Sequence, residues 1–130
     1  MTGLWMFLAV AVAGGLGAVA RFALDGWVRA RTSRSSVASF PVGTVVINVT
    51  GSFVLGVVTG LALAHAVPDE LRLVVGTGFC GGYTTFSTAS LETVRLVQQR
   101  RTGLALVNGV GTLLTTVGVA ALGLWLGLLP

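Results

Sequence analysis

Residues 76–92 read GTGFCGGYTTFSTASLE, and this stretch decides how the chain folds. It lies among apolar runs, yet it combines the pair Gly81-Gly82 with a series of hydroxyl side chains. Two adjacent glycines destabilise a helix interior, because glycine loses the most backbone entropy on folding. In lipid, the backbone groups freed by a break must find partners inside the protein or in water. The stretch therefore predicts a helix broken at mid-membrane, which is typical of an ion-binding site.

The composition indicates an integral membrane protein. The chain has 130 residues, of which 54% are hydrophobic and only 9% are charged. Its net charge is +4, and all eight basic residues are arginines. Most of these arginines lie between apolar runs, where cytoplasmic loops of membrane proteins carry them. The charge therefore predicts a membrane orientation and no nucleic-acid partner.

The apolar runs predict an all-α fold with four transmembrane helices in a single domain. A helix that spans a bilayer needs about 20 predominantly apolar residues. The predicted spans cover about residues 4–24, 42–66, 71–97 and 104–129, with a polar loop over about 25–40. No basic residue precedes the first run, so it is expected to be a retained helix and not a cleaved signal peptide.

Loop arginines predict the orientation in the cell inner (plasma) membrane. The first and third loops carry more arginines than the second, which has Arg72 alone. Positively charged loops stay in the cytoplasm, so these two loops are expected there and both termini outside. Small residues on every span, such as the Gly14/Ala18 pair, let helices approach closely in lipid. They predict that the chain dimerises and builds its site at the interface.

The polar residues of the spans indicate a pathway for a small anion and not the active site of an enzyme. No carboxylate lies at the centre of a span, and no nucleophile–base pair or metal-ligand cluster is visible. Neutral donors and the positive ring edge of Phe86 can replace an anion's hydration without a fixed charge. Each hydroxyl taken singly is expected to bond its own helix. The donors expected together at membrane depth are Asn48, Ser52, Thr84, Thr85, Ser87, Thr88, Thr112 and Thr116. Unwound carbonyls at Gly81-Gly82 suit a cation instead.

Three motifs resemble the Fluc family of fluoride channels, which is also called CrcB. Residues 78–88, GFCGGYTTFST, closely resemble the third-helix signature of that family. Residues 14–22 resemble its first-helix motif, and residues 41–53 resemble its second. The resemblance covers nearly the whole chain in order and length.

The resemblance implies a fluoride-specific channel that exports fluoride passively from the cytoplasm and so lowers its toxicity. It implies four helices per subunit and an antiparallel dimer with two pores along the interface. It also implies a structural Na⁺ at the dimer centre, held by the backbone carbonyls of Gly81 and Thr84 and not transported. The vestibule arginine of the family corresponds to Arg21. The implied fluoride pathway consists of Asn48, Phe86, Ser87, Thr88, Thr112 and Thr116.

One position departs from the family pattern. A second pore phenylalanine is expected three residues after Phe86, and this chain has Ala89 there. The strong arginine bias also opposes insertion of one sequence in both orientations. Some members of the family are heterodimers of two related chains. The departure and the bias together favour a related, oppositely oriented partner over an identical one.

Two other functions compete with a channel. A small four-helix multidrug exporter is expected to carry a glutamate within its first helix, and this chain has none. A non-transporting membrane assembly subunit would leave the polar residues of the broken helix without a purpose. Glu92 and Asn108 fit either a vestibule or ordinary packing.

Overall fold

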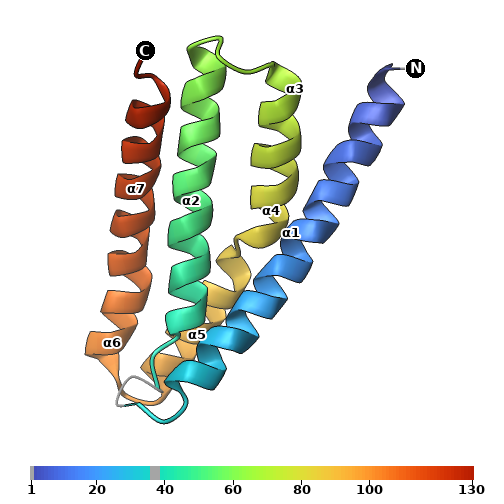
Figure 1. The fold of residues 1–130 in the computed structure, drawn as a ribbon. Coiled ribbons are helices and arrows are strands. Elements are labelled where there is room, and N and C mark those ends of the chain that lie inside the picture. The colour runs from blue at the N-terminus through green and yellow to red at the C-terminus, as the bar shows by residue number, and fades with distance from the viewer. Residues whose placement is uncertain (1, 36–38) are drawn as a thin grey trace.

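The computed structural model describes residues 2–35 and 39–130, and every regular element in these ranges is a helix. The predicted all-α fold is confirmed. The elements form four long helical segments that run side by side or cross at shallow angles (Figure 1). In chain order they are α1 (Thr2–Thr32), α2 (Val42–Leu63), α3 (Asp69–Leu71), the π-helix η1 (Arg72–Cys80), α4 (Gly81–Tyr83), α5 (Phe86–Gln98), α6 (Thr102–Leu106), the π-helix η2 (Val107–Gly111) and α7 (Thr112–Gly127).

Three stretches within the described residues are long and apolar enough to cross a membrane. They are Gly3–Thr32, Val42–Leu63 and Thr102–Gly127. The remaining segment, from α3 to α5, is interrupted and more polar, yet it runs beside the others through the same layer (Figure 1). Both chain ends lie at one end of the bundle, as an even number of spans requires (Figure 1).

The first helix is longer than its apolar run predicts. The loop expected over about residues 25–40 begins only after Thr32, because α1 continues through Asp25 and Arg29. These two side chains form an ion pair at 2.8 Å with the i,i+4 spacing that supports a helix. The second helix begins at Val42 directly after Pro41, as predicted, and ends at Leu63. His65 then turns the chain with a positive φ of 55°.

The glycines of the spans are used for packing within the chain. A Cβ on Gly17 of α1 would collide with the carbonyl oxygen of Phe79 in η1. A Cβ on Gly123 of α7 would lie 2.9 Å from the backbone nitrogen of Val57 in α2. These approaches hold α1 on the third segment and α7 on α2. The small residues that suggested a dimer are therefore largely engaged inside one subunit.

Candidate functional site

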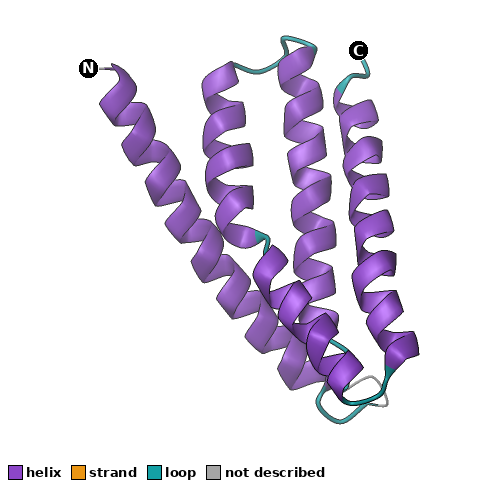
Figure 2. Ribbon diagram, turned by 180° about the vertical axis from the view of Figure 1, so that it is seen from behind, coloured by secondary structure: helices purple, strands orange, loops and turns teal. Residues whose placement is uncertain are grey.

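The third segment leaves the helical conformation at Thr84 and Thr85. Thr84 has φ −80° and ψ 160°, and Thr85 has φ −149° and ψ 123°. The short loop between α4 and α5 is visible in Figure 2. The break was expected at Gly81-Gly82, and that position is wrong, because both glycines are helical residues of α4. Gly82 is required instead for packing, since a Cβ there would collide with the carbonyl oxygen of Gly14 in α1.

The side chain of Asn48 holds the break in place from α2. Its Nδ2 donates to the carbonyl oxygen of Thr85 at 2.9 Å, and its Oδ1 accepts from the Thr85 amide at 2.8 Å. Asn48 is only 9% exposed, and Thr85 is equally buried. One amide side chain thus satisfies both backbone groups of an extended residue, which would otherwise be buried without partners.

The hydroxyl of Thr85 caps the N-terminus of the helix that follows. Thr85 is the N-cap of α5, and its Oγ1 accepts from the Thr88 amide at 3.2 Å. The same hydroxyl donates to Thr88 Oγ1 at 3.1 Å and lies 3.3 Å from Ser87 Oγ. The three hydroxyls form one cluster at the N-terminus of α5. A helix N-terminus carries the positive end of the helix dipole, so this cluster lies where negative charge is stabilised.

The hydrogen bonds at the break also redirect two amide donors. In an unbroken helix the amides of Thr85 and Thr88 would donate to the carbonyls of Gly81 and Thr84. Here the first amide donates to Asn48 and the second to the Thr85 hydroxyl. The carbonyls of Gly81 and Thr84 are thereby released from their helical partners. Such carbonyls are the acceptors that a hard cation takes as ligands.

A groove of about 560 Å³ lies beside the break, between α2, α5 and the fourth segment. It brings together predicted pathway residues from three separate helices. They are Asn48, Phe86, Thr112 and Thr116, and they are joined by Ser52 and Thr85. Several hydroxyls do bond their own helices, as expected for each taken singly: Thr84 donates to Cys80 and Thr116 to Leu113.

A second hollow, of about 240 Å³, lies on the other side of Thr85. It is lined by Arg21 and Thr88 together with Thr85, Phe22 and Thr44, among other residues. The predicted vestibule arginine therefore neighbours one pathway residue, Thr88, and not the groove that holds Asn48. The exposed Ser87 lines neither hollow.

Asn108 packs the fourth segment onto α5 at the floor of the groove. It is 2% exposed, and its Nδ2 donates to Thr93 Oγ1 at 2.9 Å and to the Ala89 carbonyl at 3.3 Å. Asn108 lies within η2, whose wider π-helical turn is a feature often found at functional sites. Ala89, the residue that departs from the family pattern, lines the same groove.

Glu92 lies farther along α5, at a hollow of about 350 Å³ near the loop end of the bundle. Its carboxylate is largely buried and lies 3.6 Å from a guanidinium nitrogen of Arg29. Asp25 holds the same arginine from α1. Glu92 thus belongs to a charge cluster that is separate from the groove at Asn48.

Two contributions to the site are not apparent from the sequence pattern alone. Thr85 is one of many candidate donors, and its place as the N-cap before an amphipathic helix could distinguish it. Tyr83 stacks on Phe79 at a centroid distance of 5.7 Å and reaches Thr50 through its hydroxyl at 2.9 Å. This contact depends on the packing of α4 against α2, which spacing along the chain does not reveal.

Comparison with known proteins identifies the family. Residues 8–128 match the model of the CrcB-like protein family, described as Camphor Resistance (CrcB). The chain belongs to the CrcB-like family. A relative in Leifsonia xyli subsp. xyli, named fluoride-specific ion channel FluC 1, is 63% identical over 92% of this chain and 85% of its own length. FluC 2 of Cutibacterium acnes is 47% identical over 98% of both chains, and FluC 2 of Mycobacterium tuberculosis (strain H37Rv) is 42% identical over 93% of this chain and 90% of its own.

Proposed function

We propose that the chain is a subunit of a fluoride-specific ion channel. The observation that carries the proposal is the groove beside the break, where neutral donors from three helices converge on the N-terminus of α5. The CrcB-like relatives that are named fluoride-specific channels match nearly the whole chain. The residue types in the groove and their placement therefore fit the function that the names of the relatives give.

The chemistry of the groove suits a small anion. Fluoride is strongly hydrated, so a pathway must replace its water with donors. The amide of Asn48 and the hydroxyls of Ser52, Thr112 and Thr116 are neutral, and neutral donors do not hold the ion so tightly that it cannot leave. The Thr116 hydroxyl would turn from the Leu113 carbonyl to donate to the ion. Phe86 adds a ring edge with positive electrostatic potential. The hollow that holds Arg21 and Thr88 would form the entrance, because arginine attracts anions and Asp25, which also lines the hollow, is paired with Arg29.

Transport by this pathway would be passive and outward from the cytoplasm. No carboxylate lines the groove, so proton-coupled exchange has no evident carrier there. A passive fluoride pathway in the cell inner membrane lowers the fluoride concentration in the cell and so its toxicity.

The working unit proposed is an antiparallel dimer. Phe86 is 88% exposed in the single subunit, and Phe22 is 84% exposed, although each borders one of the two hollows. A second subunit over these rings would close both hollows into pores. Ala89 and the arginine bias favour a related partner chain, and the activity of the purified chain alone tests this. If the chain alone conducts fluoride in liposomes as well as a co-expressed pair does, the related partner is not needed.

The released carbonyls of Gly81 and Thr84 would hold a structural Na⁺ at the dimer centre. Backbone oxygens suit this ion, and the redirected amides support the proposal because they no longer donate to these two carbonyls. The ion would supply positive charge between the subunits and would not itself move. The side chains at these two positions would matter less than their backbone conformation.

Growth of a fluoride-sensitive bacterial strain tests the proposed function. Expression of the chain, with its genomic partner where one exists, should restore growth in millimolar fluoride. The same cells should gain no resistance to cationic dyes, which a multidrug exporter would confer. Failure to restore growth by a protein that is present in the membrane would contradict the proposal and favour an assembly subunit.

A further inference from the structure

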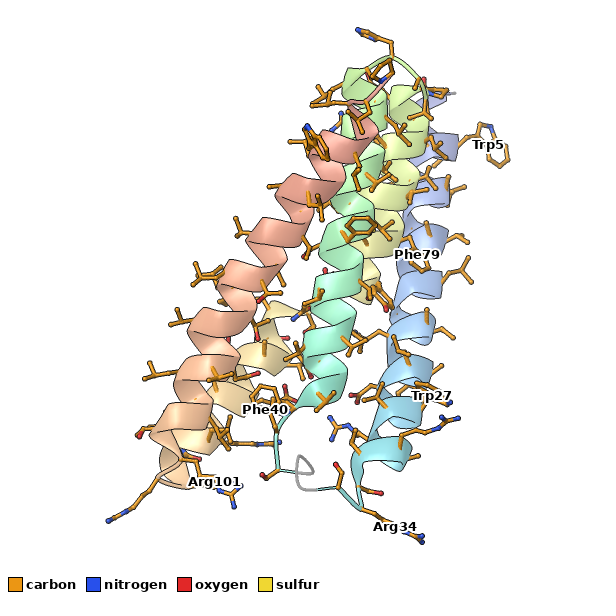
Figure 3. All side chains as sticks on the ribbon, turned by 60° about the vertical axis from the view of Figure 1, so that its left-hand side comes forward. Trp5, Trp27, Arg34, Phe40, Phe79 and Arg101 are labelled. Carbon is orange, nitrogen blue, oxygen red and sulfur yellow. The ribbon has the colours of Figure 1, made fainter. Side chains whose placement is uncertain are left out.

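The last two turns of α1 extend past its own apolar run. A helix rises 1.5 Å per residue, so the 31 residues of α1 extend about 46 Å. The hydrocarbon layer is about 30 Å thick, and the apolar run of α1 ends near Leu24. We therefore expect the segment from Asp25 to Thr32 to lie at the level of the lipid headgroups. Figure 3 shows Trp27 at this end of the bundle, opposite to Trp5.

The inward face of this extension is electrically neutralised. Arg29 pairs with Asp25 at 2.8 Å and reaches Glu92 at 3.6 Å. Its positive charge is thus shared between two carboxylates of the same subunit. Arg29 is 65% exposed, but the two carboxylates offset its charge, so it attracts a negatively charged ligand less than an unpaired arginine does.

The outward face of the extension carries positive charge without a carboxylate. Trp27 and Arg31 are one helical turn apart, and the Arg31 guanidinium carbon lies 4.4 Å from the centroid of the indole ring. Among the described residues, no carboxylate forms an ion pair with Arg31 or with the exposed Arg34 that follows the helix. Cation–π stacking fixes the direction of a guanidinium while leaving its donors free. Tryptophan with arginine is the side-chain pair that anchors helices in the headgroup layer.

The turn between α5 and α6 adds charge at the same end. Arg100 has a positive φ of 59°, a conformation that glycine or asparagine adopts more readily than arginine. Arg101 follows it directly and lies at the same end as Arg34 (Figure 3). At the opposite end, Arg72 is within 3.4 Å of Asp69, so its charge is partly neutralised. The free positive charge of the bundle is therefore concentrated at one membrane surface.

We propose that the outward face formed by Trp27, Arg31 and Arg34 binds the phosphate of an anionic phospholipid headgroup. The guanidinium groups would donate to the phosphate oxygens, and the indole ring would lie beside the glycerol backbone of the lipid. Phosphatidylglycerol would bind there in preference to the zwitterionic phosphatidylcholine. This site is independent of the ion pathway, because none of its residues lines the groove at the break.

Native mass spectrometry of the intact protein in detergent, titrated with each lipid, tests the proposal. Wild type should retain phosphatidylglycerol more tightly than phosphatidylcholine. Arg31→Gln should weaken phosphatidylglycerol binding about fivefold, which corresponds to one arginine at an anionic surface. Trp27→Leu should weaken it as well. The matched controls at the other end, Arg72→Gln and Trp5→Leu, should bind as wild type does.

Three outcomes would overturn the proposal: equal binding of the two lipids, equal losses in the controls, or displacement of the lipid by free glycerol phosphate at equal concentration. The last would show a soluble-phosphate site. With each reconstituted together with the related partner chain in phosphatidylcholine liposomes, Arg31→Gln should release fluoride as wild type does, which verifies that the variant folds. If Arg31→Gln loses the preference for phosphatidylglycerol and keeps normal efflux, the lipid site is supported. If wild type itself shows no efflux, that result contradicts the proposed channel and not the lipid site.

Discussion

Two neighbouring parts of the third segment, Gly81-Gly82 and Thr84-Thr85, have different structural roles. Gly81 and Gly82 look like the helix breakers, yet both are helical, and Gly82 lets α1 approach the third segment closely. Thr84 and Thr85 look like ordinary helix residues, yet the chain is extended there. The difference shows that the lost helical bonds depend on a partner elsewhere, which is Asn48 on α2.

A break in a membrane helix is stable where its backbone groups find other partners. At Thr85 an amide side chain and a capping hydroxyl provide them. At Gly81-Gly82 no such partner is needed, because the helix continues. Four experiments separate these two parts of the signature, and they are ordered by their expected effect on stability.

Asn48→Ala should have the largest effect. It leaves both backbone groups of Thr85 buried without partners, and each such group costs about 1–3 kcal/mol. The free energy of unfolding in detergent should fall by about 2–4 kcal/mol. Thr59→Val on the same helix is the control, because Thr59 only bonds the carbonyl of Leu55. Equal stability of the two variants would show that Asn48 does not hold the break.

Gly82→Ala should be destabilising, whereas Gly81→Ala should not. The added methyl group at Gly82 collides with the carbonyl oxygen of Gly14, and overpacking of this kind costs about 1–3 kcal/mol. A methyl group at Gly81 meets no atom within 4 Å, and alanine favours a helix over glycine by up to about 1 kcal/mol. In detergent, the melting temperature should therefore fall for Gly82→Ala and rise for Gly81→Ala. A destabilised Gly81→Ala would restore the view that this pair is the break.

Thr85→Val should cost about 1 kcal/mol, the usual value of an N-cap hydroxyl. Valine keeps the shape of threonine and leaves the backbone bonds to Asn48 intact, so the loss is confined to the cap of α5 and the hydroxyl contacts with Thr88 and Ser87. Hydrogen exchange in the first turn of α5 should accelerate, while exchange in α7 should not change. Thr115→Val, which removes a hydroxyl that only bonds its own helix, is the control. Uniform acceleration along the chain would contradict a local capping role.

Phe86→Ala should have the smallest effect on the stability of the isolated subunit, within about 0.5 kcal/mol, because the ring is 88% exposed there. Its effect should appear instead in the proposed dimer. Phe86→Ala should therefore lower the free energy of unfolding more in protein reconstituted at high density than in dilute monomer in detergent. Leu114→Ala on α7, also highly exposed, provides the comparison.

The helical class, the spans and the identity of the polar residues follow from composition and hydropathy. The position of the break does not, because Gly82 and Thr85 acquire their roles from contacts with Gly14 and Asn48, far away in the sequence. The extension of α1 was missed for a related reason: hydropathy ends a span where polarity begins, but a helix continues when Asp25 and Arg29 support it. The separation of Arg21 from the groove at Asn48 likewise depends on how the helices face each other.

Fluoride efflux from liposomes, followed with a fluoride-selective electrode, tests the central claim most directly. Wild type, reconstituted together with its related partner chain, should release fluoride rapidly and release no chloride in the same assay. Phe86→Ala should insert normally and yet lose most of this efflux, because its ring lines the groove beside the break. Asn48→Ala should lose it as well. Undiminished fluoride efflux in both variants would show that the ion does not pass the break held by Asn48, and equal efflux of chloride by wild type would contradict a fluoride-specific channel.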